Sequence, residues 1–99
     1  MTTVSVVIPV YNAAATLLRC LDSLFAQTLR DFEIICVDDG STDESLALLE
    51  GTAARRAADG DIRIVVLHQS NTGTFVARKR GVAAARGDYL CFVDPDDTV

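Results

Sequence analysis

The sequence predicts an α/β fold of three layers, in which a mainly parallel sheet with the strand order 3-2-1-4 lies between helices. Short apolar runs alternate with amphipathic segments along the chain, in the order β-α-β-α-β-α-β. The apolar runs are rich in β-branched residues and lack polar alternation, which is typical of strands buried on both faces. Right-handed crossovers favour this strand order, and the chain then reverses direction between the first and fourth strands.

The boundaries of these elements follow from local signals. Strands are expected at residues 4–10, 32–37, 62–67 and 88–93. The first helix has apolar residues at helical spacing, namely Leu17, Leu21, Leu24 and Phe25. Ser41 and Glu44 form a capping box, which predicts the start of the second helix. The third helix is expected at 75–86, where small residues such as Gly81 would let it pack close to the sheet and Gly87 would end it.

Length and charge restrict the classes of function. The chain has 99 residues and a net charge of -5, so we expect one domain spanning 1–99 and no nucleic acid as the main partner. No apolar run approaches the ~18 residues of a membrane span, and no secretory signal is visible. The three cysteines, Cys20, Cys36 and Cys91, lie in apolar runs without a CxxC spacing. We therefore expect three small buried residues and a reducing, cytoplasmic location.

Polar and aromatic residues gather where three of the predicted strands end. The first strand ends at Pro9 and Tyr11, the second at Asp38 and Asp39, and the fourth at Asp94. These strands are neighbours in the predicted sheet, and ligands of open α/β sheets bind at such a switch point, outside the carboxyl ends of the strands. The sequence therefore predicts one pocket with an aromatic ring and up to five carboxylates.

Three carboxylates fall within four residues at the end of the fourth strand: Asp94, Asp96 and Asp97. They repel one another, and a bound divalent cation would remove that repulsion. Oxygen-only ligands suit Mg²⁺ or Mn²⁺, which would then bridge to phosphate oxygens. The alternative is a solvated acidic turn, because Asp and Pro are ordinary turn residues.

The other candidate residues suggest a nucleotide. One carboxylate of Asp38 and Asp39 would cap the following helix, and the other would accept the N–H of a uracil or thymine ring. Tyr11 would pack against that base, or simply lie at the rim of the core. Arg78, one turn into the third helix, is a candidate diphosphate contact. His68, the only histidine, follows the third strand at the sheet edge and is interpreted as a surface or loop residue.

Four segments in this order resemble family-two glycosyltransferases with the GT-A fold: SVVIPVYN at 5–12, DFEIICVDDGSTDES at 31–45, the NTG…AR…G stretch at 71–81, and GDYLCFVDPDD at 87–97. The resemblance implies the Rossmann-like half of that fold and a nucleotide-sugar donor, usually a UDP-sugar, with inversion at the anomeric carbon. It implies that Pro9 and Tyr11 line the nucleoside pocket, that Asp38 reads the base, and that Arg78 lies near the phosphates. Asp94 and Asp96 match the DXD pair, with Asp96 as direct metal ligand and Asp97 able to share that role.

The resemblance also implies a direct displacement, in which the metal ion assists the departing diphosphate and a downstream carboxylate acts as general base. The chain ends at Val99, so we expect a donor-binding portion without the acceptor half, which alone binds the donor weakly or not at all and does not turn over. The acceptor of the longer protein would be carbohydrate or lipid-linked, at the cytoplasmic face of the membrane. An uncovered fourth strand would favour self-association through the sheet edge.

Three other functions are compatible with parts of the pattern. A receiver domain shares the layout, but its acidic pair follows the first strand, whereas the pair here follows the second. It also needs a lysine after one of its last strands, and Lys79 lies within a predicted helix. A non-catalytic module that binds a nucleotide or a protein could use the same fold. A sugar nucleotidyltransferase would need a Gly-rich basic loop after the first strand, where Tyr11-Asn12-Ala13-Ala14 stands instead.

Overall fold

The computed structural model describes residues 4–26, 31–58 and 62–95. The elements follow one another in the expected order: β1 (Val4–Val10), α1 (Ala14–Phe25), β2 (Phe32–Asp39), α2 (Ser45–Ala58), β3 (Ile64–Gln69), α3 (Thr74–Ala84) and β4 (Tyr89–Phe92). Among these described helices, none is both long enough and apolar enough to cross a membrane.

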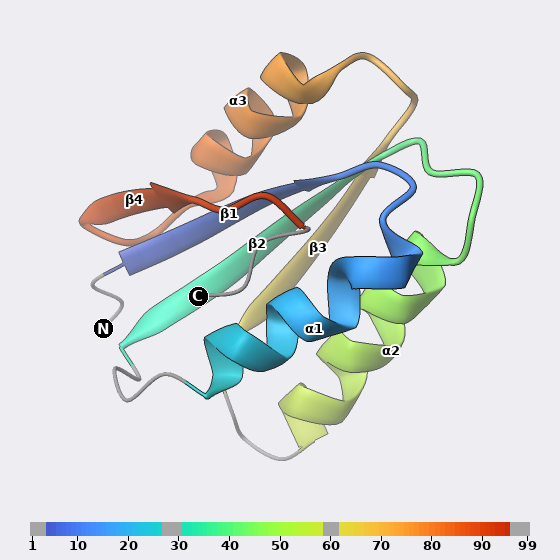
Figure 1. Cartoon of the computed structure of the whole chain (residues 1–99). Coiled ribbons are helices and arrows are strands. Elements are labelled where there is room, and N and C mark those ends of the chain that lie inside the picture. The colour runs from blue at the N-terminus through green and yellow to red at the C-terminus, as the bar shows by residue number, and fades with distance from the viewer. Residues whose placement is uncertain (1–3, 27–30, 59–61, 96–99) are drawn as a thin grey trace.

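The four strands form one sheet in the order β3-β2-β1-β4, and every neighbouring pair is parallel, which confirms the predicted topology. Helices α1 and α2 lie below the sheet and α3 lies above it (Figure 1). Val10 of β1 is in register with Asp38 of β2, and Val7 pairs with Phe92 of β4. The carboxyl ends of β1, β2 and β4 therefore meet at one edge of the sheet.

The two faces of the sheet are packed unequally. Val6, Ile8 and Cys36 belong to the larger cluster, together with the apolar faces of α1 and α2. Ile35 and Val37 pack with Ala77 on the α3 face. All residues of β4 are exposed, so Cys91 is exposed and the expectation of three buried cysteines was wrong for this one. β4 lies at the edge of the sheet, and no described helix packs over it closely enough to bury its side chains.

Two predicted helix boundaries were wrong, because Ser41 and Gly87, the residues on which they were based, have other contacts in the structure. Helix α2 begins at Ser45 rather than near Ser41. The hydroxyl of Ser41 instead accepts a hydrogen bond from the backbone N–H of Asn12 at 2.9 Å. Gly87 does not cap α3, which ends at Ala84. It lies against β1, where an added Cβ would come within 2.7 Å of the backbone nitrogen of Ser5, so no side chain fits there.

A buried carboxylate connects the segment before β4 to the central strands. Glu33 Oε2 accepts hydrogen bonds from the Ser5 hydroxyl at 2.6 Å and from the Arg86 N–H at 2.7 Å. Glu33 Oε1 accepts from Arg63 at 2.8 Å. Burial favours the neutral acid, but these hydrogen bonds and the charge of Arg63 outweigh it and lower the pKa of Glu33. The ionised carboxylate thus fixes where the chain enters β4, at the edge opposite the candidate site.

Gly81 and Gly51 provide a matched test of how closely α3 packs on the sheet. A Cβ at Gly81 would collide with the Val7 side chain, whereas nothing lies within 4 Å of one at Gly51. We expect Gly81→Ala to lower the free energy of unfolding by about 1–2 kcal/mol. The steric clash with Val7 costs more free energy than the higher helix propensity of alanine gains. Gly51→Ala is expected to raise it by up to about 1 kcal/mol. Urea unfolding of both variants measures this, and equal effects would contradict the close packing.

Candidate functional site

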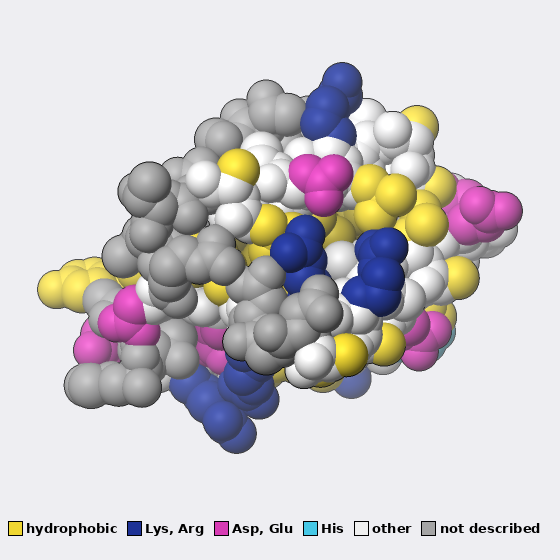
Figure 2. Space-filling view, turned by 90° about the horizontal axis from the view of Figure 1, so that it is seen from below, with side chains coloured by type: hydrophobic (Ala, Val, Ile, Leu, Met, Phe, Trp, Pro, Cys, Tyr) yellow, Lys and Arg dark blue, Asp and Glu magenta, His cyan; other side chains and the backbone are white. Residues whose placement is uncertain are grey.

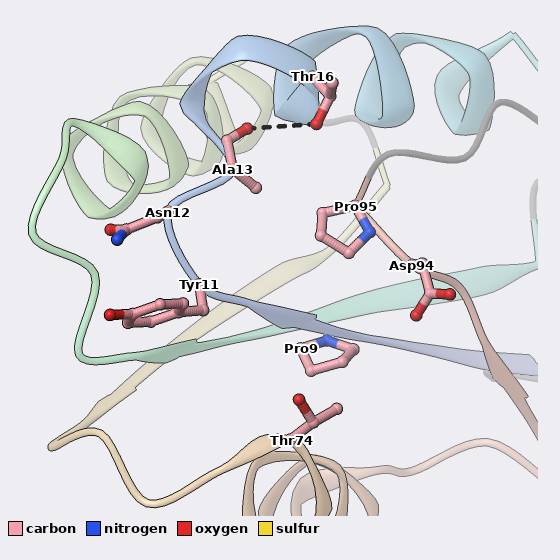
Figure 3. A pocket seen from close by; sticks show the side chains of 8 residues that line it. All are labelled: Pro9, Tyr11, Asn12, Ala13, Thr16, Thr74, Asp94 and Pro95. Carbon is pink, nitrogen blue, oxygen red and sulfur yellow. Dashed lines mark hydrogen bonds between the residues drawn. The ribbon is translucent and has the colours of Figure 1, made fainter.

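An open cleft of about 510 Å³ lies at the carboxyl end of β1, between the starts of α1 and α3 and the end of β4 (Figure 3). It is lined by Pro9, Tyr11, Asn12, Ala13, Thr16, Thr74, Asp94 and Pro95. Three residues singled out in the sequence, Pro9, Tyr11 and Asp94, thus share one cleft, although they are up to 85 positions apart in the chain, from 9 to 94. Thr16 and Thr74 were not foreseen, because only the packing of α1 and α3 brings their first turns to this edge.

Opposite charges meet at the β4 side of this cleft. Arg78 donates a hydrogen bond to Asp94 Oδ1 at 3.4 Å, and both side chains are about half exposed. The Arg78 guanidinium also lies 5.9 Å from the centre of the Phe92 ring. Such an exposed pair contributes little to stability, so both groups are available to a ligand that carries charge.

The remaining acidic residues of the expected metal site, Asp96 and Asp97, lie outside the described residues. Within residues 4–26, 31–58 and 62–95, no three His, Cys, Asp or Glu side chains are grouped closely enough to hold a metal ion. Asp94 is therefore the one member of the expected ligand set that the structure places, and its side chain faces the cleft (Figure 3).

Asp39 organises the loop that leads into α3. Its Oδ1 accepts hydrogen bonds from Gln69 Nε2 at 2.9 Å and from the Thr72 N–H at 2.8 Å, and its Oδ2 accepts from the Gly73 N–H at 2.9 Å. Burial acts to raise the pKa of Asp39, but these hydrogen bonds outweigh it and lower the pKa. Gly73 precedes Thr74, which lines the cleft, so Asp39 lies directly behind one wall of the site.

Asp38 faces the other side of the sheet. Strand alternation places it with Cys36 and Val10 in the layer covered by α1 and α2, and none of its surface is exposed. Its Oδ2 accepts a hydrogen bond from the Ser41 N–H at 3.2 Å, while Oδ1 has no partner among the described residues. Asp38 is therefore not among the residues that line the cleft, and its role in reading a base stays a prediction.

His68 lies at the surface, as the sequence predicted, but it belongs to β3 rather than to a loop. It is in register with Asp38, and its Nδ1 lies 3.0 Å from Asp38 Oδ2. Its carbonyl oxygen accepts a hydrogen bond from Arg80 at 2.5 Å. The contact follows from the β2–β3 register, which no local sequence signal specifies.

A second hollow, of about 420 Å³, is lined by Leu18, Asp22, Arg55 and Arg56 of α1 and α2. Figure 2 views the molecule from the side of these helices, where Lys or Arg side chains lie beside hydrophobic ones. This hollow shares no lining residue with the cleft and contains no residue that the sequence singled out. It provides control positions for tests of the cleft.

The loop contacts of Asp39 make a pH-dependent contribution to stability. At neutral pH we expect Asp39→Asn to lower the free energy of unfolding by about 1 kcal/mol, because the N–H₂ group of the amide cannot accept a hydrogen bond and one of the two backbone donors loses its partner. A lowered folded-state pKa means that this contribution is present above the unfolded-state pKa and is lost as the pH falls through the folded-state pKa. The difference between variant and parent should therefore shrink on acidification.

Urea unfolding from neutral pH down to about pH 3 measures this difference, with Asp22→Asn as the control on the exposed surface of α1. Amide exchange at Thr72 and Gly73 should accelerate in Asp39→Asn alone. A difference that stays constant with pH would contradict the assignment of an ionised, hydrogen-bonded Asp39.

Comparison with known proteins gives consistent matches over nearly the whole chain. The chain is 48% identical over 96 residues to the uncharacterized glycosyltransferase EpsJ of Bacillus subtilis, which covers 97% of this chain and 26% of that protein. It is 44% identical over 95 residues to the uncharacterized glycosyltransferase YibD of Escherichia coli, covering 96% of this chain and 26% of YibD. The chain thus spans about a quarter of the length of these relatives.

Among solved structures, S. aureus TarS 1-349 in complex with UDP matches with a TM-score of 0.85 and 30% identity, covering 98% of this chain and 28% of the solved chain. TarS 1-349 in complex with UDP-GlcNAc matches with a TM-score of 0.82 and 29% identity, over 98% of this chain and 27% of the solved chain. The parallel sheet with order 3-2-1-4 is therefore the Rossmann-like part of a GT-A fold. The family model for glycosyl transferase family 2 matches residues 5–99, and the chain belongs to that family.

Proposed function

We propose that the chain forms the donor-binding part of a glycosyltransferase that moves a sugar from a UDP-sugar to an acceptor hydroxyl with inversion. The observation that carries this proposal is the cleft at the switch point of the sheet, lined by Pro9, Tyr11 and Asp94, in a chain of glycosyl transferase family 2. The fold similarity to TarS, a protein solved with UDP and with UDP-GlcNAc, supports the choice of a uridine nucleotide.

The nucleoside is assigned to the β1 side of the cleft. Pro9 and the half-exposed Tyr11 offer apolar surface to a base and ribose. We transfer the base contact from Asp38 to Asp39, which lies on the α3 side of the sheet, next to the cleft wall. Asp39 Oδ2 accepts one N–H, from Gly73, and a carboxylate oxygen can accept a second, such as the imide N–H of uracil.

The diphosphate is assigned to the β4 side of the cleft. Arg78 supplies guanidinium donors there, and Asp94 with Asp96 and Asp97 offers the oxygen-only ligands that Mg²⁺ or Mn²⁺ prefers. When bound, such an ion would neutralise charge on the departing diphosphate. Arg78 would then exchange its 3.4 Å contact with Asp94 for phosphate oxygens.

The remaining functions of the protein are assigned outside the 99 residues. The general base and the site for a carbohydrate or lipid-linked acceptor would lie in the three quarters of the relatives that this chain does not match. The exposed Tyr89, Leu90 and Phe92 of the edge strand β4 would be covered there, or by a second copy of the chain when that part is missing.

An NMR titration of the ¹⁵N-labelled chain with UDP and Mg²⁺ tests the proposal. The amide signals of Tyr11, Thr74 and Asp94 should shift together, and the shifts should weaken when Mg²⁺ is removed, because Asp94 would help to hold the ion and the ion would neutralise charge on the diphosphate. Asp94→Asn should abolish the effect of Mg²⁺, whereas Asp22→Asn should leave it unchanged. If no signal near the cleft moves at high UDP concentration, or if shifts cluster around Arg55, the proposed donor site is wrong.

A further inference from the structure

The turns after β1 and β2 are joined by hydrogen bonds that centre on the Asn12 side chain. Asn12 Oδ1 accepts from the backbone N–H of Thr42 at 2.7 Å and from that of Asp43 at 3.3 Å, and it lies 3.3 Å from the Thr42 hydroxyl. In Figure 3, the Asn12 side chain points from the end of β1 toward the loop between β2 and α2. One amide oxygen thus satisfies consecutive donors of a loop 30 residues away in sequence.

Side chains of the segment 41–45 in turn accept hydrogen bonds from the backbone of the turn after β1. The Ser41 hydroxyl accepts from the Asn12 N–H at 2.9 Å, and the Ser45 hydroxyl accepts from the Ala13 N–H at 2.9 Å. Asp43 Oδ2 accepts from the Ala14 N–H at 3.1 Å. Ala13, at the N-cap of α1, has no side-chain acceptor, so residues that precede and begin α2 satisfy the first free N–H groups of α1. The two turns therefore form one interlocked unit.

The backbone at Asn12 has a left-handed conformation, which the hydrogen bonds between the two turns must hold in place. Its φ of 49° is the one positive value at a non-glycine residue in the described part of the chain. Asn tolerates the left-handed region better than most residues, and the surrounding structure must fix such a conformation. The sharp turn at Asn12 sets the direction in which the preceding residue, Tyr11, leaves the end of β1.

Tyr11 depends on this backbone for its position. Its side chain is 50% exposed, and no hydrogen bond from another described residue holds its hydroxyl group. The neighbouring Val10 is fully buried in the core, so the chain on that side is fixed. The turn at Asn12 fixes the backbone on the other side of Tyr11, and with it the direction in which the ring leaves the chain.

We propose that Asn12 is a positioning residue of the cleft, which locks the turns at 11–14 and 41–45 together and thereby holds the Tyr11 ring in place for a nucleoside. The nucleoside as ligand rests on the proposed function, whereas the lock itself does not. Asn12 meets both requirements of the lock, because it has an acceptor oxygen at the right reach and accepts a positive φ. Asp shares both properties, whereas Gly shares only the second.

Variants with Asp or Gly at position 12 therefore separate the role of the acceptor oxygen from that of the backbone conformation. Asn12→Asp keeps the acceptor and should behave as the parent does. Asn12→Gly keeps the backbone conformation and removes the acceptor, so it should free the turn while the packed strands stay folded. Ser41→Ala removes only the bond to the Asn12 N–H and provides a milder variant should Asn12→Gly unfold. Amide spectra of β1 and β2 check that each variant retains its core.

The first measurement needs no ligand. The chain has no tryptophan and two tyrosines, so Tyr89→Phe leaves Tyr11 as the single fluorescent reporter. In that background, Asn12→Gly and Ser41→Ala should lower the Tyr11 fluorescence anisotropy and increase its quenching by acrylamide, and Asn12→Asp should not. Equal anisotropy in all variants would overturn the lock, as would an Asp variant that is impaired as strongly as the Gly variant.

The second measurement is the affinity for UDP with Mg²⁺. Asn12→Gly should weaken UDP binding by on the order of tenfold and Asn12→Asp by less than about twofold, since only the former lets the ring leave its bound position. If the parent binds UDP and Asn12→Gly binds it equally well, the positioning role is wrong while the proposed function stands. If the anisotropies differ as expected but the parent binds no UDP, the lock stands and the proposed function fails.

Discussion

The parallel pairing of β1 with β2 on one side and with β4 on the other determines where the cleft forms. With Val10 opposite Asp38 and Val7 opposite Phe92, all three strands end at the same edge. Each then leads into a turn that has no ladder partner and must find its hydrogen bonds elsewhere. The cleft lies among these turns, so its walls are set by the sheet register and by the polar side chains that complete the turns.

Adjacent acidic residues acquire different roles because a strand alternates its side chains. Asp38 turns to the α1 and α2 face, where His68 and the Ser41 N–H engage one oxygen. Asp39 turns to the α3 face, where it binds the backbone that leads to Thr74. Together with Asn12, these side chains fix the loops around the cleft by hydrogen bonds to their backbone, as regular secondary structure does elsewhere. A site assembled in this way can be rigid although it consists largely of turns.

The topology could be predicted from the sequence because it depends on patterns that span whole elements. Buried β-branched runs, helical spacing and the handedness of crossovers are sufficient to give the strand order that the structure confirms. They also bring Pro9, Tyr11 and Asp94 to one cleft. What the sequence could not specify depended on single contacts. The hydrogen-bond partners of Asp38, Asp39 and His68 require the strand register or the loop path, and neither is encoded in a local pattern. The predicted capping role of Ser41 was wrong for the same reason.

We propose that UDP and a divalent metal ion bind together in the cleft beside Asp94, and paramagnetic broadening by Mn²⁺ tests this proposal. With UDP present, substoichiometric Mn²⁺ should broaden the amide signals of Asp94, Thr74 and Tyr11. Signals of Arg55 and Arg56, which line the separate hollow and belong to the last turn of α2, should broaden less. Broadening that requires UDP and is centred on Asp94 is the predicted result. Broadening that is centred elsewhere, or that is the same without UDP, would contradict the account.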